Sequence, residues 1–254
     1  MKVLVCIKRV PAVAGRITLT ADQLAIDDRY LGFTIGPHEE CAVEEAIRLI
    51  EAHGGESVVL TLGPEAALEQ LRDAMAMGVT RAIHVVTDGA DWDAESTAIA
   101  IVDAIRDDEQ ASGPFDLILL GNEAADSGGY QVAVRIGRML GRPVLTGLKG
   151  LAVTDAVVHG ERAVTSGRDV YEVPAPAVAA VLEGLNLPRY PSVPGRLRAK
   201  SKPVATSSPA RPTQRLELLE LIVPPGAAKQ VTVLGEGPGA ASATVDVLDR
   251  LGVL

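Results

Sequence analysis

The sequence predicts an α/β protein in which helices cover both faces of a parallel sheet. Four apolar runs of strand length, at 2–8, 57–63, 82–88 and 116–121, are each followed by a segment of helical periodicity, and this alternation is typical of βαβ units. The 254 residues are 47% hydrophobic but include only one Trp, four Tyr and two Phe. An aliphatic core of this kind suits buried parallel strands, so one three-layer domain is expected up to about residue 148.

The first long helix is expected at 38–52. Gly36-Pro37 precedes it, a permissive cap followed by a residue with a preset φ, and Glu39 and Glu40 lie where the positive end of the helix dipole favours acids. The glycines after His53 end the helix. One face of it carries the apolar positions Ala42, Ala46, Leu49 and Ile50.

Three further helices follow the later strands. They are expected in "EAALEQLRDAMAMG" (65–78), in "AESTAIAIVDAIRDD" (94–108) and after the glycine-containing loop near residue 130. The last of these has the apolar stripe Val132, Ile136, Met139 and Leu140.

From residue 149 the pattern changes to that of antiparallel strands. A hairpin is predicted to turn at His159-Gly160, and "DVYEVPAPAVAAVLEG" (169–184) is expected to return as one strand that extends an edge of the parallel sheet. Residues 201–214, rich in Pro, Ser and Thr, indicate an extended linker. A helix at about 241–251 would then end an arm that packs on a partner subunit.

Charge and composition restrict the function classes. The net charge of −9 disfavours binding to nucleic acid or to an anionic membrane. Lys8 and Arg9 interrupt the first apolar run too early for a secretion signal, and no 18-residue apolar stretch follows, so a cytoplasmic protein without membrane insertion is expected. Cys6 and Cys41 stand alone, which indicates buried thiols rather than a disulfide or a metal site.

No catalytic signature is present. The sequence lacks GxxxxGK[ST], HExxH and GxSxG. Of the four histidines, only His38 is a site candidate, because it opens a helix at the carboxyl end of the first strands, where α/β proteins bind ligands. The run from Gly235 to Ala240 formally matches a relaxed dinucleotide fingerprint, but no second strand follows it, so a turn and a terminal helix are expected.

The strongest candidate for ligand binding is the loop in "LILLGNEAADSGGYQVAVRIGRMLG" (117–141). It leaves a buried strand, leads to a helix N-terminus and contains Asp126-Ser127-Gly128-Gly129. The backbone amides of Ser127 to Tyr130 could bind a phosphate. Asp126 could equally be an ordinary cap beside a tight turn. The residues alone leave these two interpretations open.

Five blocks of the chain, in order, resemble the β subunit of electron transfer flavoproteins. They are "KVLVCIKRVP", "AVEEAIRLIEAHGGE", "LGPEAALEQLRDAMAMGVTRAIHV", "LLGNEAADSGGYQV" and "LNLPRYPSVPGRLRAKSKPV". The resemblance implies an adenine nucleotide α-hydrolase-like fold and a heterodimer with an α subunit that carries the redox FAD. It also implies that this chain binds a structural AMP and has no catalytic residues of its own.

The implied role is that of an electron carrier in fatty acid β-oxidation. Electrons would come from flavin dehydrogenases of the acyl-CoA type and pass through electron transfer flavoprotein–quinone oxidoreductase to the quinone pool. One alternative is an electron-bifurcating subunit, which would bind a second FAD and use NADH. Another is a stand-alone adenine-nucleotide-binding regulatory protein.

The resemblance also implies where the ligands bind. The cofactor-binding residues would be Cys6, Gly36, Pro37, His38, Glu39, Leu62, Gly121, Asn122, Glu123, Ala124, Ala125, Asp126, Ser127, Gly128, Gly129, Tyr130, Gln131 and Val132. The partner recognition loop would comprise 191–200, with Pro191, Ser192, Val193, Pro194 and Gly195 in contact with the dehydrogenase. These assignments divide the chain into an α/β domain (1–190), that loop, and a linker with a C-terminal arm on the α subunit (201–254).

Two departures from the family bear on the cofactors. The resemblance implies that Val13 and His38 would lie near the flavin, at positions where well-known members have aromatic residues. The loop lacks both the acidic run with Asn-Gln-Thr of AMP-binding members and the Gly-Asp-Thr of bifurcating ones, and keeps only Gln131-Val132 of the latter. AMP is favoured, because a second flavin also needs room for its ring.

Overall fold

The computed structural model describes residues 1–12, 17–223 and 231–254. Val13, one of the two residues expected near the flavin, lies outside this part of the chain. The chain divides into two units, Met1–Glu220 and Leu221–Leu254.

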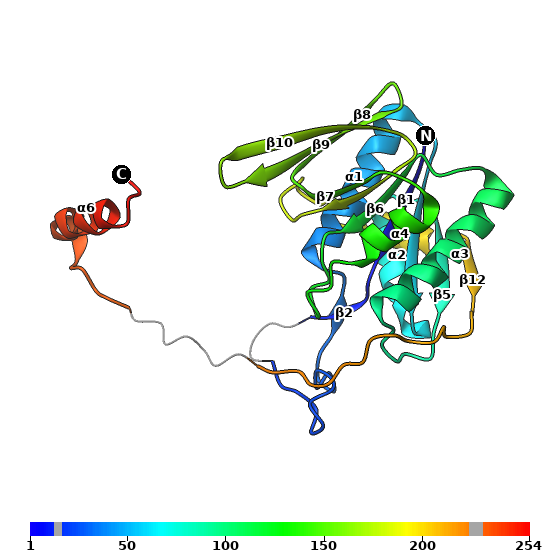
Figure 1. Cartoon of the computed structure of the whole chain (residues 1–254), viewed down its shortest axis with the longest axis horizontal. Coiled ribbons are helices and arrows are strands. Elements are labelled where there is room, and N and C mark those ends of the chain that lie inside the picture. Colours follow the sequence, from blue (N-terminus) through cyan, green and yellow to red (C-terminus); the bar gives the residue numbers. More distant parts are fainter. Residues whose placement is uncertain (13–16, 224–230) are drawn as a thin grey trace. The chain divides into compact units, whose positions relative to one another are not determined.

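The centre of the first unit is a seven-stranded parallel sheet (Figure 1). In spatial order it contains β12 (Val204–Ser207), β5 (Arg81–Val86), β4 (Glu56–Gly63), β1 (Lys2–Ile7), β6 (Leu117–Gly121), β11 (Ala177–Val181) and β7 (Val144–Leu148). All neighbouring pairs are parallel. The predicted α/β class is therefore confirmed.

Helices cover both faces of the sheet, as the aliphatic composition predicts. The helices of this unit are α1 (Pro37–His53), α2 (Leu68–Met77) after the short η1 (Glu65–Ala67), α3 (Ala94–Ser112), α4 (Val132–Leu140) and α5 (Val193–Ala199). The alternating side chains of β1 divide the core into two layers. Val3, Val5 and Ile7 face α1 and α2, whereas Leu4 and Cys6 face α3 and α4.

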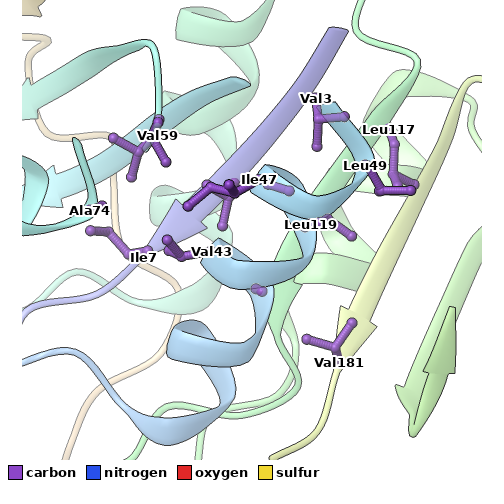
Figure 2. Packing of buried hydrophobic residues seen from close by; sticks show 14 of the residues in the cluster. Val3, Ile7, Val43, Ile47, Leu49, Val59, Ala74, Leu117, Leu119 and Val181 are labelled. Atoms are coloured by element: carbon purple, nitrogen blue, oxygen red, sulfur yellow. The ribbon is translucent and has the colours of Figure 1, made fainter. Parts of the chain in front are cut away.

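The packing of α1 shows how its sequence pattern produces this core. Val43, Ile47 and Leu49 lie on the helix face that meets the sheet beside Val3 and Leu119 (Figure 2). All five residues are at most 5% exposed. Gly36 caps the helix in an extended conformation with Pro37 at its first position, as predicted.

The antiparallel strands form a sheet of their own instead of extending the parallel one. β8 (Gly150–Thr154), β9 (Val157–Val164) and β10 (Gly167–Pro174) pair in the order β10-β9-β8. The predicted turn at His159-Gly160 was wrong, because both residues lie inside β9, and the chain turns at Asp155 and Ala156 with positive φ. The segment 169–184 is two strands, since the chain breaks pairing at 175–176 and continues as β11 between β6 and β7.

The segment expected to be a linker contains the edge strand β12. Its residues Val204 to Ser207 pair with β5, and their register aligns Val204 with Ala82. The expected division at residue 201 therefore separates β12 from the other six strands of the sheet. The sequence pattern did not predict this strand, because its residues are mostly small and show no clear alternation of apolar and polar side chains. Its pairing partner β5 also lies more than 100 residues away in the sequence. A further ladder of two short strands, β2 (Val10–Pro11) and β3 (Phe33–Thr34), lies just before α1.

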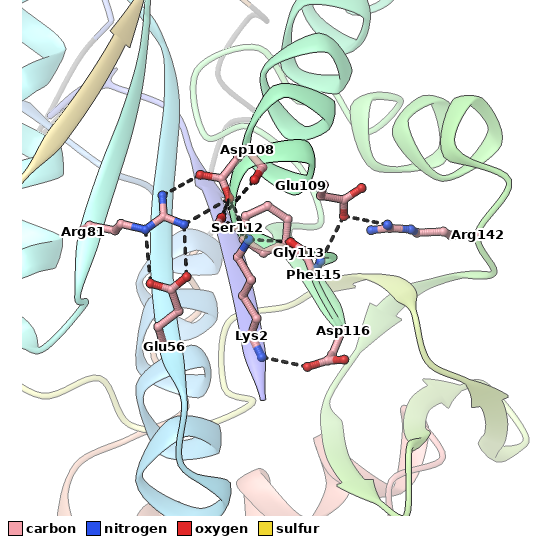
Figure 3. A network of polar contacts seen from close by, with 10 residues as sticks. All are labelled: Lys2, Glu56, Arg81, Asp108, Glu109, Ser112, Gly113, Phe115, Asp116 and Arg142. Atoms are coloured by element: carbon pink, nitrogen blue, oxygen red, sulfur yellow. Dashed lines mark hydrogen bonds and ion pairs between the residues drawn. The ribbon is translucent and has the colours of Figure 1, made fainter.

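A polar network joins the amino ends of the central strands (Figure 3). Arg81 lies between Glu56 and Asp108, with its guanidinium nitrogens 2.6 Å from Asp108 Oδ2 and 3.1 Å from Glu56 Oε1. Lys2 Nζ donates to Asp108 Oδ1 at 2.7 Å and to the Gly113 carbonyl at 2.6 Å. The network lies at the edge of the sheet opposite to the Gly121–Val132 loop, and we interpret it as structural.

The second unit contains the short η2 (Gly237–Ala240) and α6 (Ala241–Arg250), which confirms the predicted terminal helix. Neither element contains a buried residue. Among the described residues of the whole chain, no helix is both long and apolar enough to cross a membrane.

Candidate functional site

Three segments meet at the carboxyl ends of β1 and β6, and they form the candidate nucleotide site. Lys8, directly after β1, donates from Nζ to Asp126 Oδ2 at 2.6 Å. A Cβ placed on Gly121, at the end of β6, would lie 3.0 Å from His38 Cβ and 2.9 Å from Glu39 Cδ. The first turn of α1 is therefore packed closely against the start of the Gly121–Val132 loop, and any larger residue at 121 would require Glu39 or His38 to shift.

The loop is closed by its own backbone. The Gly128 amide donates to the Ala124 carbonyl at 2.8 Å, and the Ala124 amide donates to the Gly129 carbonyl at 3.0 Å. This corrects the expectation that all amides from Ser127 to Tyr130 are available to a ligand, since that of Gly128 is already used. Ser127, Gly129 and Tyr130 are exposed, and among the described residues no hydrogen-bond acceptor contacts their amides.

The loop leads directly into α4. Gln131 occupies the N-cap position without a side-chain cap, and instead its Oε1 accepts from Arg135 NH2 at 3.0 Å. The first amides of α4 thus lack a protein cap, and the positive end of the helix dipole faces the loop. Both features favour an anion at this position.

Unsatisfied polar atoms collect in the same three segments. Arg9 Nε, His38 Nδ1, Glu39 Oε2 and Asp126 Oδ1 are buried and have no hydrogen-bond partner among the described residues. Buried polar atoms normally have partners, so such a group requires an explanation. A polar ligand that supplies both donors and acceptors would satisfy them, and an adenine nucleotide has this character.

Glu39 is the most unusual side chain of the site. It is 4% exposed, and the position of a Cβ on Gly36 would be only 2.5 Å from its Oε2. Burial raises the pKa of this carboxyl to about 7, and the nearby negative charge of Asp126 adds to the effect while Lys8 opposes it. Glu39 thus carries a proton for much of the time at neutral pH.

Most of the expected cofactor-binding residues lie together at the carboxyl ends of β1 and β6, but some of them have side chains that are buried or already bonded within the protein. Cys6 is part of the core beneath the site, where burial raises the pKa of its thiol to about 12. Leu62 is half-buried at the end of β4. Asn122 Oδ1 accepts from the Gly147 amide at 2.8 Å and so fixes the start of the loop to β7.

Sequence reasoning missed Lys8 and Arg9 as site residues. Arg9 lies over the Phe33 ring, 3.2 Å from its centroid, and Lys8 pairs with Asp126. Their position directly after the first strand was the signal that could have identified them, because strand carboxyl ends line ligand sites in this class of fold.

The expected partner recognition loop is mostly helical. Ser192 caps α5, and its Oγ accepts from the Gly195 amide at 3.1 Å. Gly195 is buried, and a Cβ on it would lie 2.3 Å from the Ala76 carbonyl oxygen at the end of α2. Several apolar side chains of this segment and of the residues before it are exposed: Leu187 (84%), Tyr190 (95%), Val193 (73%) and Leu197 (63%).

Polar contacts fix both ends of this segment to the helices beneath it. Arg189 forms ion pairs with Glu44 at 2.8 Å and with Glu51 at 2.6 Å, both on α1. After α5, Arg72 NH1 donates to the Ala199 carbonyl at 2.6 Å, and Lys202 Nζ donates to two carbonyls near the end of α2. The exposed apolar side chains are therefore presented from a fixed backbone.

The seven-stranded parallel sheet with helices on both faces defines an α/β protein, with the uncapped start of α4 at the carboxyl edge of the sheet. The sequence model of the electron transfer flavoprotein domain matches residues 23–212. The chain belongs to the electron transfer flavoprotein β-subunit family.

Named relatives agree with this placement. The chain is 35% identical over 237 residues to the electron transfer flavoprotein subunit beta of Syntrophomonas wolfei, covering 93% of this chain and 91% of the relative. It is 35% identical to the Bacillus subtilis subunit, over 80% of this chain and 77% of the relative. Identity to the Bradyrhizobium diazoefficiens subunit is 34%, with 89% and 90% covered.

Proposed function

We propose that this chain is the β subunit of a heterodimeric electron carrier and that its Gly121–Val132 loop holds a structural AMP. The observation that carries the proposal is the group of unsatisfied buried polar atoms on the segments that lead to the uncapped N-terminus of α4. Of these residues, His38, Glu39 and Asp126 lie within the region matched to the family. Relatives are named as β subunits, which supports pairing with an α subunit.

The α subunit would hold the redox FAD at the subunit interface. When bound, FAD supplies the electron storage, so this chain needs no catalytic acid or base. Its own residues would bind the nucleotide and present the docking segment. Flavin dehydrogenases of the acyl-CoA type would donate electrons to the heterodimer. The heterodimer would pass the electrons to the quinone pool through electron transfer flavoprotein–quinone oxidoreductase. We propose the cytoplasm as the location of this carrier.

AMP fits the loop through its phosphate. Exposed amides of Ser127, Gly129 and Tyr130 lie beside the free amides of α4, and Gly128 and Gly129 add no side chains in front of them. The unsatisfied Arg9 Nε and His38 Nδ1 could then contact the remaining polar atoms of the nucleotide.

The second candidate is an electron-bifurcating subunit with a second FAD in place of AMP and with NADH as donor. Gln131-Val132, which the bifurcating members share, is the observation that favours it. A stand-alone adenine-nucleotide-binding regulatory protein is disfavoured by the match to named β subunits over most of the chain.

The test is to coexpress the chain with its α partner, release the bound ligands from the purified complex and count them. One FAD and one AMP per heterodimer are expected. Two FAD and no AMP would establish the bifurcating alternative and overturn the AMP assignment. A chain that purifies alone as a stable nucleotide complex, without flavin and without binding an α subunit, would overturn the carrier assignment.

A further inference from the structure

We propose that Glu39 couples anion binding at the Gly121–Val132 loop to uptake of a proton, so that the loop binds its nucleotide with Glu39 neutral and loses affinity when Glu39 ionises. This inference rests on the proposed nucleotide site. It adds a regulatory property to that site, because the occupancy of the loop would then depend on pH through one identifiable side chain.

The position of the Glu39 carboxyl is the first argument. It lies between the N-cap of α1 and the start of the loop, with Gly36 on one side and Gly121 on the other. Cβ positions on these glycines would be 2.5 Å from Oε2 and 2.9 Å from Cδ, respectively. The carboxyl is thus enclosed between the first turn of α1 and the start of the loop that would bind the anion, and at 4% exposure water screens a charge there poorly.

The charges around Glu39 are the second argument. Asp126 in the loop and Glu40 on α1 are acidic neighbours, and Lys8 after β1 is the cation that acts on it. Lys8 Nζ is already 2.6 Å from Asp126 Oδ2. An ionised Glu39 would therefore be a second carboxylate sharing one ammonium group, before any phosphate arrives.

Two further polar residues, His38 and Arg9, belong to the same site as Glu39. His38 precedes Glu39 on α1, and its buried Nδ1 has no partner among the described residues. The Arg9 guanidinium lies over the Phe33 ring. Burial already raises the pKa of the Glu39 carboxyl to about 7, so a modest further increase on anion binding would be felt at neutral pH.

The proton balance follows from these contacts. Binding of the anion would draw one proton from solvent to a Glu39 carboxylate oxygen, and release of the anion would return it. Affinity is then constant at low pH and falls as pH rises above the pKa of the free site. For each unit by which the bound anion raises the Glu39 pKa, the total loss of affinity between low and high pH increases about tenfold.

The test is a titration of AMP into the nucleotide-free heterodimer between pH 6 and pH 9. Wild type is expected to lose about tenfold more affinity over this range than Glu39→Gln, which mimics the protonated carboxyl. Comparing the two proteins cancels the titration of the AMP phosphate itself. Glu40→Gln is the matched control, an acid-to-amide change at the next position of the same helix. It should keep most of the loss seen in wild type, because Glu40 contributes least among the charges that act on Glu39.

A second ligand tests whether the pH dependence comes from the phosphate. Adenosine, which lacks the phosphate, should show no pH-dependent difference between wild type and Glu39→Gln.

Calorimetry in two buffers of different ionisation enthalpy tests the proposal in wild type alone. Uptake of up to one proton per AMP near pH 8 is expected. No proton uptake, or the same pH profile in wild type and Glu39→Gln, would overturn the coupling while leaving the AMP site intact. Failure of wild type to bind AMP at any pH would instead overturn the proposed nucleotide site.

Discussion

At the scale of single residues, the backbone conformation of Gly128 restricts which residue the loop can carry at this position. Its φ is +62°, a left-handed conformation that side chains with a branched Cβ rarely adopt. No atom of the described residues lies within 4 Å of the position a Cβ would take. Glycine is therefore required here by the backbone conformation rather than by space.

Gly128→Val should reduce the AMP retained by the purified heterodimer by at least about tenfold, because the loop must leave the left-handed conformation at a cost of about 1–2 kcal/mol or more. The measurement is the nucleotide content after gel filtration. Gly32→Val is the control, the same change at a glycine outside the loop, where φ is not positive and no described atom lies within 4 Å of the position of a Cβ. Equal retention in wild type and Gly128→Val would remove this loop from the phosphate site.

Glu39 also predicts a pH-dependent stability. Its pKa is raised from 4.5 to about 7 in the folded chain, so between these values the folded state binds more protons than the unfolded state, and stability falls as pH rises. In nucleotide-free protein, Glu39→Gln should be more stable than wild type by about 3 kcal/mol at pH 8 and equally stable at pH 4. Urea unfolding at both pH values measures this. A difference that is the same at pH 4 and pH 8 would contradict it.

The sequence identified the site residues unevenly. Glycines of the loop and the first turn of α1 were expected on the basis of residue type and family resemblance, and the structure brings both together. Lys8 was not expected, because its role depends on the pairing of β1 with β6, which places it beside Asp126, 118 residues further along the chain. Sequence pattern does not encode such a contact.

At the scale of elements, the segment around α5 is a preformed surface. Arg189 before it and Arg72 beneath its end fix the backbone to α1 and α2. A docking surface whose backbone is already ordered loses little conformational entropy on binding. Such a surface suits a carrier that must associate and dissociate rapidly.

Val193→Asp should slow electron delivery from an acyl-CoA dehydrogenase to the heterodimer by about tenfold or more at limiting carrier concentration, because a buried unpaired carboxylate at the interface costs several kcal/mol. The flavin absorption spectrum should not change. Val170→Asp on β10 is the matched control, a valine of similar exposure, 63% against 73%. An unchanged rate for Val193→Asp would show that α5 is not the docking element.

Elements with strong periodicity were predicted well, and elements defined by pairing were not. The bounds of α1 agree to within one residue at each end. The hairpin turn was misplaced because His159-Gly160 has the composition of a turn, whereas Gly160 is needed inside β9 for packing: a Cβ on it would lie 2.8 Å from a methyl group of Leu145. Tertiary packing overrode local turn propensity.

At the scale of the whole molecule, the two units differ in how they are stabilised. All buried apolar residues of the described chain lie between Val3 and Ala199, and the helices of the second unit bury none. The first unit therefore contains its own core, whereas the second unit leaves apolar side chains exposed, where a partner could cover them. The α subunit is the partner that we propose.

A chain that ends at Glu220 should keep the melting temperature of the full chain to within about 2 °C, because no core residue is lost. It should bind the α subunit at least about tenfold more weakly, provided the arm contributes to that interface as proposed. Thermal unfolding followed by circular dichroism and a coexpression pull-down measure the two effects. A large loss of melting temperature would show that the second unit supports the first.

The edge strand β12 has a consequence for association between copies of the chain. An open sheet presents unpaired backbone groups at its edges, where strands of other molecules can add. β12 is only four residues long and is bounded by Pro203 before it and by Pro209 two residues after it, and proline cannot donate to a strand ladder. At this edge of the sheet, β12 therefore offers only a short run of unpaired backbone groups to a strand of another molecule, which limits aggregation there.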